Sequence, residues 1–163
     1  QTWVTAAQFE AFWSWFGPAL HRIRYQRHLC PLWVSGYICG FMSREEADVV
    51  LADKQIGSFI LRLSVRMAGQ FAVSYCGYDD KGVPGVFHYL IQATDVLGAK
   101  KTLPDFLGQD QPSLTTLCQV LPCAHTMLME ERQYAWADKD EVLSSYYSKR
   151  VDASTTGYTQ RIG

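Results

Sequence analysis

The sequence predicts an α+β fold in which a central antiparallel sheet is flanked by two helices. Three observations lead to this prediction. Apolar residues recur with helical spacing near both ends of the chain, segments in its middle alternate in the manner of strands, and turn-forming residues separate those segments. The 163 residues have the size of one ordinary domain. We expect further helices before this unit, and a C-terminal helix and an extended tail after it.

The composition is that of a folded, nearly neutral protein. Hydrophobic residues make up 48% of the chain and the formal net charge is -1, which excludes wholesale disorder and argues against a general nucleic-acid-binding surface. No apolar run is long enough to cross a membrane, and the first residues lack a signal-peptide pattern. We therefore expect a piece of a longer soluble protein without membrane contact.

The cysteines and histidines indicate neither a metal nor another cofactor. Five scattered cysteines form no C-x-x-C pair, and the four histidines do not add ligands at zinc-binding spacings. The odd number of cysteines favours a reducing, intracellular compartment. Cys123 and His125 would be the nucleophile and base of a hydrolase, but no third group that could orient them is evident, and a buried structural cysteine is the favoured interpretation.

An aromatic stripe near the start of the chain predicts a helix that packs tightly against another part of the protein. Its members recur at i, i+3, i+4 and i+7: Phe9, Phe12, Trp13 and Phe16. Gly17 and Pro18 are expected to end this helix, and Pro18 to begin a second helix that runs to about Leu29. We interpret the arginines of the second helix as a solvated or partner-facing surface.

Residues 43–93 are expected to form a capped helix followed by three antiparallel strands. Ser43 and Glu46 match the S-x-x-E capping box that opens a helix. Residues 58–64, 70–76 and about 86–93 alternate in the manner of strands, with a polar turn before the last of them. The first strand should place Phe59, Leu61 and Leu63 on one face of the sheet. The opposite face should carry Ile60, Arg62 and Ser64.

Two short helices and a tail are expected after the strands. Ser113 is expected to cap a helix whose apolar residues are Leu114, Leu117, Cys118 and Leu121. The acidic run at residues 138–141 predicts the start of the C-terminal helix. Beyond residue 150 the chain is small and polar, has no core-forming period, and leads to Tyr158.

Arg62 is the residue that most requires a partner, because it lies within an apolar strand and a guanidinium is not stable when buried alone. Its partner is either a fixed carboxylate of the domain or an anionic ligand. Ser64 shares its strand face, and Arg44 lies in the first turn of the capped helix, where the helix dipole opposes a cation and an anion would reverse that cost. Together these three side chains predict a pocket for a phosphate monoester.

Five sequence blocks resemble the STAT family of transcription factors, in the family's order. Residues 57–64 (GSFILRLS) are similar to its G-T-F-L-L-R-F-S strand, the second strand of a Src-homology-2 (SH2) domain. Residues 32–41 (LWVSGYICGF) resemble its L-W-N-D-G-x-I-x-G-F segment. The other blocks are the aromatic helix at residues 12–16, the K-D-E and Y-Y-S motifs within residues 139–148, and the final Gly157 and Tyr158.

The resemblance implies a division of the chain and a role for individual residues. Residues 1–40 would end a helical linker domain, 41–147 would form the SH2 domain, and 148–163 would be the phosphotyrosyl tail. By similarity, the phosphotyrosine-binding residues are Arg62, which grips the phosphate bidentately, together with Arg44 and Ser64, and Tyr158 is the phosphorylation site. The family usually continues R-F-S-E-S where this chain has R-L-S-V-R, so Arg66 either replaces a lost hydroxyl donor or points to solvent. His88 either contacts the phosphotyrosine ring or packs within its strand.

The function that the resemblance implies is conditional binding, without enzymatic activity. The partners would be a phosphotyrosine peptide, a second copy bound through the phosphorylated tail, a tyrosine kinase and a phosphorylated receptor. DNA would be bound only by upstream domains that this chain lacks, and the protein would move from the cytoplasm to the nucleus when phosphorylated. The alternative is a degenerate SH2-like domain with a structural role, in which an internal carboxylate holds Arg62.

Overall fold

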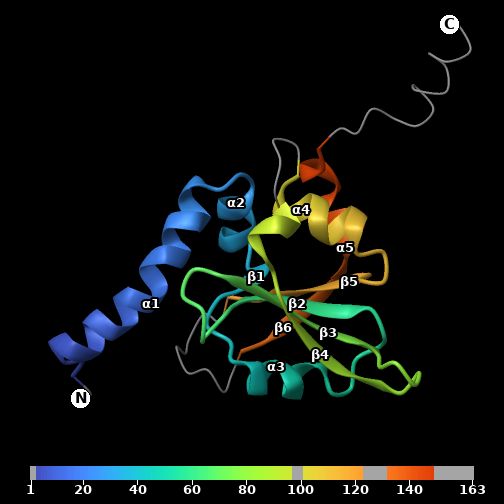
Figure 1. Cartoon of the computed structure of the whole chain (residues 1–163), viewed down its shortest axis with the longest axis horizontal. Coiled ribbons are helices and arrows are strands. Elements are labelled where there is room, and N and C mark those ends of the chain that lie inside the picture. The colour runs from blue at the N-terminus through green and yellow to red at the C-terminus, as the bar shows by residue number, and fades with distance from the viewer. Residues whose placement is uncertain (1–2, 97–100, 123–131, 149–163) are drawn as a thin grey trace, which may run out of the picture.

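The computed structural model describes residues 3–96, 101–122 and 132–148, which form a mixed sheet with helices on both sides (Figure 1). The described helices are α1 (Ala6–Tyr25), α2 (Leu29–Val34), α3 (Arg44–Leu51), α4 (Leu103–Asp105), which a π-helical turn (Phe106–Asp110) continues, and α5 (Lys139–Leu143); short 3-10 turns span Ala93–Val96 and Ser144–Tyr146. The strands are β1 (Ile38–Cys39), β2 (Ser58–Leu63), β3 (Phe71–Tyr78), β4 (Pro84–Leu90), β5 (Thr116–Val120) and β6 (Tyr134–Asp138). The predicted α+β class is confirmed.

The strand order is β4-β3-β2-β5-β6, with β1 also paired to β2. Strands β2, β3 and β4 form the predicted antiparallel meander. Strands β1 and β5 both run parallel to β2, and they pair with different parts of it. The sheet is therefore mixed, and not antiparallel throughout as predicted, because the chain reaches β2 from β1 through a helical crossover and returns beside it at β5.

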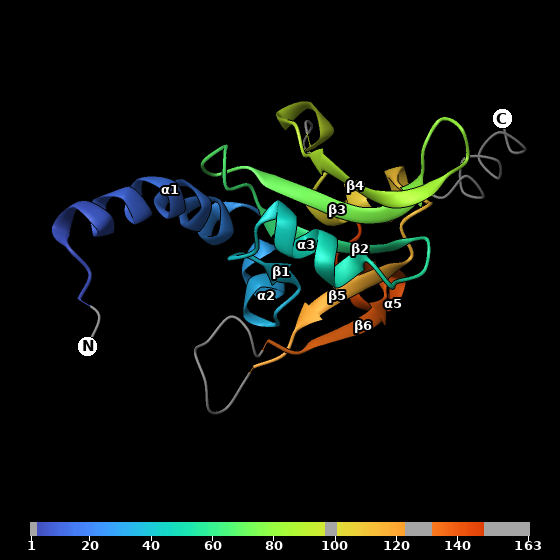
Figure 2. The ribbon, with the colours of Figure 1, turned by 90° about the horizontal axis from the view of Figure 1, so that it is seen from below.

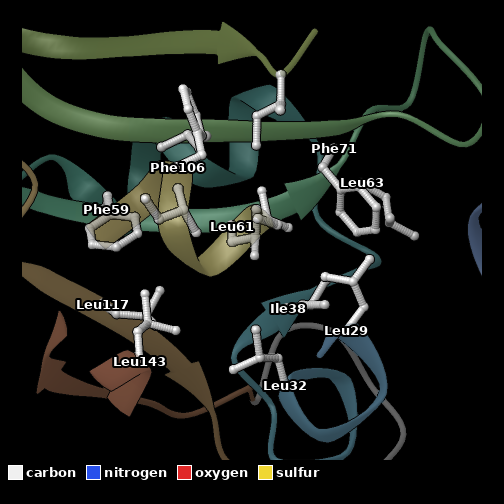
Figure 3. Close-up of a cluster of buried hydrophobic side chains, with 14 of the residues drawn as sticks. Leu29, Leu32, Ile38, Phe59, Leu61, Leu63, Phe71, Phe106, Leu117 and Leu143 are labelled. Carbon is white, nitrogen blue, oxygen red and sulfur yellow. The ribbon is translucent and has the colours of Figure 1, made fainter. Parts of the chain in front are cut away.

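The alternation of β2 separates two cores. Phe59, Leu61 and Leu63 point into the larger core, which α2, the α4 region and α5 cover (Figure 3). Ile60 lies in the second core, beneath α3. Figures 1 and 2 show α3 on the opposite side of the sheet from α2, α4 and α5. Because side chains alternate along a strand, Arg62 lies on the α3 side.

Helix α1 does not end at Pro18, as the sequence predicts, but continues through it to Tyr25. Pro18 forfeits one helical hydrogen bond, since it has no N–H. Tertiary contacts on both sides of it compensate: Trp15 donates a hydrogen bond to the carbonyl of Ser64, and Arg22 donates one to the carbonyl of Gly69. The helix is thus held to the segment between β2 and β3 about one turn before and one turn after the proline.

The aromatic stripe of α1 is also less buried than predicted. Phe9 and Trp13 are 58% and 50% exposed and stack on each other. Only the other edge of the stripe packs closely, where Phe12 stacks on Phe16 and Phe41, and Phe16 contacts Phe41 with its ring tilted. The tight packing expected of the whole stripe is therefore confined to that edge.

The helix predicted after Ser113 is wrong, because this segment forms β5. Its residues pair with β2 on one side and with β6 on the other. Leu117 lies in the larger core and Cys118 in the α3 core, which is the alternation of a strand. Sheet pairing over a long sequence separation outweighs the local capping signal here.

Two helix starts occur where predicted. Ser43 and Glu46 form the reciprocal capping box at α3, with hydrogen bonds of 3.1 and 3.2 Å. Asp138 caps α5 by accepting from the backbone N–H groups of Asp140 and Glu141. None of the helices within the described ranges is both long and apolar enough to cross a membrane.

Asp105 ties the α4 region to the end of the described chain. Its side chain is 3% exposed and accepts hydrogen bonds from the backbone N–H and hydroxyl of both Thr102 and Ser148. Burial alone would raise the pKa of Asp105, but these hydrogen bonds outweigh it and hold the pKa below its usual value. The position at which the chain leaves the domain is thus set by a buried, ionised carboxylate.

We expect Asp105→Asn to lower the free energy of unfolding at pH 7 by about 2 kcal/mol, the scale of hydrogen bonds to a charged group. Because the folded-state pKa is depressed, this contribution is full above the unfolded pKa of about 3.9 and is lost as the pH falls through the folded value. Urea denaturation should therefore show a smaller difference between parent and variant at pH 3 than at pH 7. The control Asp53→Asn removes a carboxylate that is 81% exposed and should have little effect at either pH. A difference for Asp105→Asn that is equal at both pH values would contradict the assignment.

Candidate anion-binding site

A cavity of about 400 Å³ opens between the start of α3, strand β4 and the loop that follows β2. We call residues 64–70, which connect β2 to β3, the β2–β3 loop. All four residues predicted to bind phosphate line this cavity: Arg44, Arg62, Ser64 and Arg66. His88, which sequence analysis left with two alternatives, lines it as well. The structure thus brings together side chains from three separate segments, while their part in binding stays a prediction.

Arg62 is buried and lacks an acidic partner in the described part of the chain. Its side chain is 5% exposed, its Nε donates to Ser74 Oγ at 2.9 Å, and its Nη1 makes only a long contact of 3.4 Å with the carbonyl of Leu63. No carboxylate of residues 3–96, 101–122 and 132–148 forms an ion pair with it. The positive charge of Arg62 is therefore left without a close counter-charge.

The pKa of Arg62 reflects the same imbalance. Burial lowers its pKa first, and the neighbouring Arg44 lowers it further, while Glu45 and Asp48 offset part of the decrease. The guanidinium stays charged at neutral pH, because an arginine side chain is not deprotonated in proteins. An anion placed in the cavity would remove the repulsion between the two arginines and supply the missing counter-charge.

A series of hydrogen-bonded side chains from β3, β4 and α3 orients Arg62. Ser74 Oγ, which accepts from Arg62, also lies 2.7 Å from His88 Nδ1, and His88 Nε2 lies 2.7 Å from Asp48 Oδ1. An ionised Asp48 carries no proton, so His88 Nε2–H must donate to it. In the neutral ring Nδ1 is then an acceptor, and Ser74 donates its hydroxyl proton there. Burial lowers the pKa of His88, and Arg44 and Arg62 lower it further, which together outweigh the increase caused by Asp48 and favour this neutral form.

Ser64 and the two other arginines border the cavity at different depths. Ser64 is 8% exposed, and its Oγ accepts from the backbone N–H of Met67 at 3.0 Å, which leaves the hydroxyl proton available to a ligand. Arg44 and Arg66 are both exposed. Arg66 therefore lines the cavity with a side chain that solvent reaches, so its two predicted alternatives are not mutually exclusive.

Sequence analysis missed Ser74 and Asp48. Ser74 is fully buried in the otherwise apolar first half of β3 and is paired with Ile60, one diagonal step from Arg62. A hydroxyl at an apolar strand position was a local signal for this residue. Asp48 had no such signal, because it lies on the exposed face of α3 and reaches His88 only in the folded protein. Tyr158, Cys123 and His125 lie outside the described residues.

Guanidinium and hydroxyl donors converge on this solvent-accessible cavity, an arrangement typical of domains that bind an anionic group. Comparison with known proteins identifies the kind of domain: the model of the SH2 domain family matches residues 37–119. The chain belongs to the SH2 domain family. SH2 domains are phosphotyrosine-binding modules of signalling proteins and are not enzymes.

Three relatives illustrate the match to STAT proteins. The chain is 33% identical to signal transducer and activator of transcription B of Dictyostelium discoideum over 174 residues, which covers 92% of the chain. It is 44% identical to signal transducer and activator of transcription A of the same organism over 102 residues, or 62% of the chain. Human signal transducer and activator of transcription 4 is 35% identical over 71 residues, or 44% of the chain. The aligned parts make up only 15%, 14% and 9% of these relatives.

Proposed function

We propose that this chain is the phosphotyrosine-binding region of a STAT-like signal transducer, and that it engages the phosphorylated tail of a second copy. The observation that carries the proposal is the buried Arg62, which faces an open cavity and has no carboxylate partner within the described residues. The alternative, a structural domain in which an internal acid holds Arg62, requires a contact that the described residues do not make.

Each cavity residue has a distinct role in this proposal. Arg62 presents its guanidinium fork to two phosphate oxygens, a geometry that a lysine could not match. Ser64 donates its hydroxyl to a third oxygen. Arg44 and Arg66 add positive charge at the exposed rim, where solvent reduces their contribution. Phosphotyrosine supplies a charge of roughly -1.5 to -2 and three acceptor oxygens.

The proposed source of the phosphotyrosine is Tyr158 of a partner chain. Tyr158 lies eleven positions after Tyr147, and a chain of that length spans at most about 36–40 Å. By family resemblance each tail enters the pocket of the other copy, which produces a two-fold symmetric dimer. This proposal includes a tyrosine kinase that phosphorylates the tail and a phosphorylated receptor that docks in the same pocket. It also includes DNA-binding domains upstream of this chain and entry into the nucleus after phosphorylation. So does the division into linker (1–40), SH2 domain (41–147) and tail (148–163).

The direct test compares tail peptides with and without phosphate on Tyr158. The phosphorylated peptide should bind with a dissociation constant that rises with salt, because the contacts are partly ionic. The plain peptide should show no saturable binding. Isothermal titration calorimetry at low and high salt measures both constants, and equal affinity for the two peptides would contradict the proposal.

Ser74→Ala provides a finer test of the pocket. Ser74 does not itself line the cavity, but its hydroxyl accepts from Arg62 Nε and donates to His88, and both of those side chains line it. We expect the affinity for the phosphorylated peptide to fall about three- to tenfold, because the hydrogen bond that orients Arg62 and the one to His88 are both lost. The matched control is Ser58→Ala, which changes another buried serine at the end of β2 that is far from Arg62. If both variants bind like the parent, Ser74 does not orient Arg62.

A further inference from the structure

Helix α1 holds the β2–β3 loop at both of its ends. Trp15 Nε1 donates to the carbonyl of Ser64 at 2.8 Å, at the first residue of the loop. Arg22 Nη1 donates to the carbonyl of Gly69 at 2.7 Å, near the last. The two contacts bridge 49 and 47 residues of sequence, so they are tertiary contacts between the helix and the loop.

The far end of the loop is fitted closely to the helix. Gly69 has a φ of +78°, and a side chain there would place its Cβ 2.8 Å from a side-chain carbon of Pro18. The guanidinium of Arg22 also lies over the ring of Phe71, 4.8 Å from its centre, immediately after the loop. Only glycine combines this backbone conformation with so short an approach to α1.

The loop carries two of the residues that are proposed to bind phosphate. Ser64 and Arg66 belong to the loop, and the loop is closed by a backbone hydrogen bond of 2.8 Å from Ser64 to Gln70. Because α1 holds the carbonyls of Ser64 and Gly69 near the two ends of the loop, the direction in which the loop presents its donors depends on the position of the helix. A loop held in its binding conformation before the ligand arrives loses less entropy on binding.

We propose that α1 is a working part of the phosphotyrosine site, and that Trp15 and Arg22 are positioning residues that hold the β2–β3 loop in its binding conformation. This inference rests on the proposed function. Helix α1 lies within the segment assigned to the linker, so the linker and the pocket are energetically coupled. Such coupling is reciprocal: movement of α1 weakens phosphotyrosine binding, and a bound phosphotyrosine strengthens the docking of α1.

The test uses the full chain and two variants of α1, each with a control on the same helix. Trp15→Phe keeps an aromatic ring and removes the N–H donor, and its control is Trp13→Phe, at a half-exposed ring. Arg22→Gln removes the guanidinium that donates to the carbonyl of Gly69. Its control is Arg24→Gln, which changes an exposed arginine. We expect each test variant to weaken binding of the phosphorylated tail peptide about three- to tenfold, and each control to stay within about twofold of the parent.

Two further measurements separate positioning from other causes. A purely electrostatic effect of Arg22 would disappear at high salt, whereas a positioning effect persists there and is shared by the uncharged Trp15→Phe. Hydrogen exchange of the loop amides should accelerate in both test variants before any peptide is added, and in the parent the peptide should slow exchange in α1 as well as in the loop. Parental affinity and parental loop exchange in Trp15→Phe would overturn the inference. If the parent itself fails to bind the peptide, it is the proposed function that fails.

Discussion

The variant Arg62→Ala is expected to bind the phosphorylated tail peptide at least about a hundredfold more weakly than the parent, a loss of about 2.7 kcal/mol. The reason is the position of the guanidinium: it is buried, so its ionic contact with phosphate is little screened by water, and it is the residue of the site best able to contact two oxygens at once. Calorimetric titration of parent and variant measures the ratio directly.

Arg44→Ala is the matched comparison for this prediction. Arg44 lines the same cavity with the same charge but is exposed, and exposed ion pairs contribute only about 0.2–1 kcal/mol. We expect its affinity to fall tenfold or less. Equal losses for the two alanine variants would show that burial does not rank the pocket residues.

A second substitution of Arg62 distinguishes its contribution to peptide binding from its contribution to the stability of the fold. A buried cation without a carboxylate partner costs free energy in the unliganded protein. Arg62→Met fills similar volume without the charge, so we expect its free energy of unfolding in urea to equal or exceed that of the parent while peptide binding is lost. A large decrease in stability would mean that Arg62 serves the fold and not the ligand.

The parts of the site that could be predicted from sequence are those that a local pattern carries. Arg62 and Ser64 alternate with the apolar face of one strand, and Ser43 begins a capping box that brings Arg44 to the start of α3. These features depend on neighbours within about four residues. Short-range geometry was therefore enough to single out Arg62, Ser64 and Arg44, whereas the packing of α3 against the sheet brings them to one cavity.

The rest of the site depends on contacts between distant segments. The hydrogen-bonded chain from Ser74 through His88 to Asp48 joins β3, β4 and α3, and no local pattern relates an exposed helix residue to a strand forty residues later. The segment after Ser113 has a plausible helix cap, yet pairing on two sides makes it a strand. Pro18 is a local helix breaker, yet the contacts of α1 with the β2–β3 loop carry the helix through it. In each case a tertiary interaction outweighs a local preference.

If the dimer is reciprocal, its affinity should exceed that of one pocket for one phosphorylated peptide, and this difference can be measured. Two variants each remove one half of the exchange: Arg62→Ala keeps a phosphorylatable tail without a pocket, and Tyr158→Phe keeps the pocket without a phosphorylatable tail. After kinase treatment neither variant alone should form phosphorylation-dependent dimers. A mixture of the two should form a dimer held by one contact.

The dissociation constant of this mixed dimer should equal that of the isolated phosphorylated peptide. The parent dimer should be about 10²–10⁴-fold tighter, because once one tail is bound the second contact forms at an effective concentration in the millimolar range. Analytical ultracentrifugation of the kinase-treated parent, the two variants and their mixture measures all four. A kinase-treated parent that stays monomeric while its pocket resists added peptide would indicate that each tail occupies its own pocket. A parent dimer that binds no more tightly than the mixed dimer would indicate that only one of the two contacts forms. Both pockets of a symmetric dimer can be filled only if each tail is long enough to reach the pocket of the other copy.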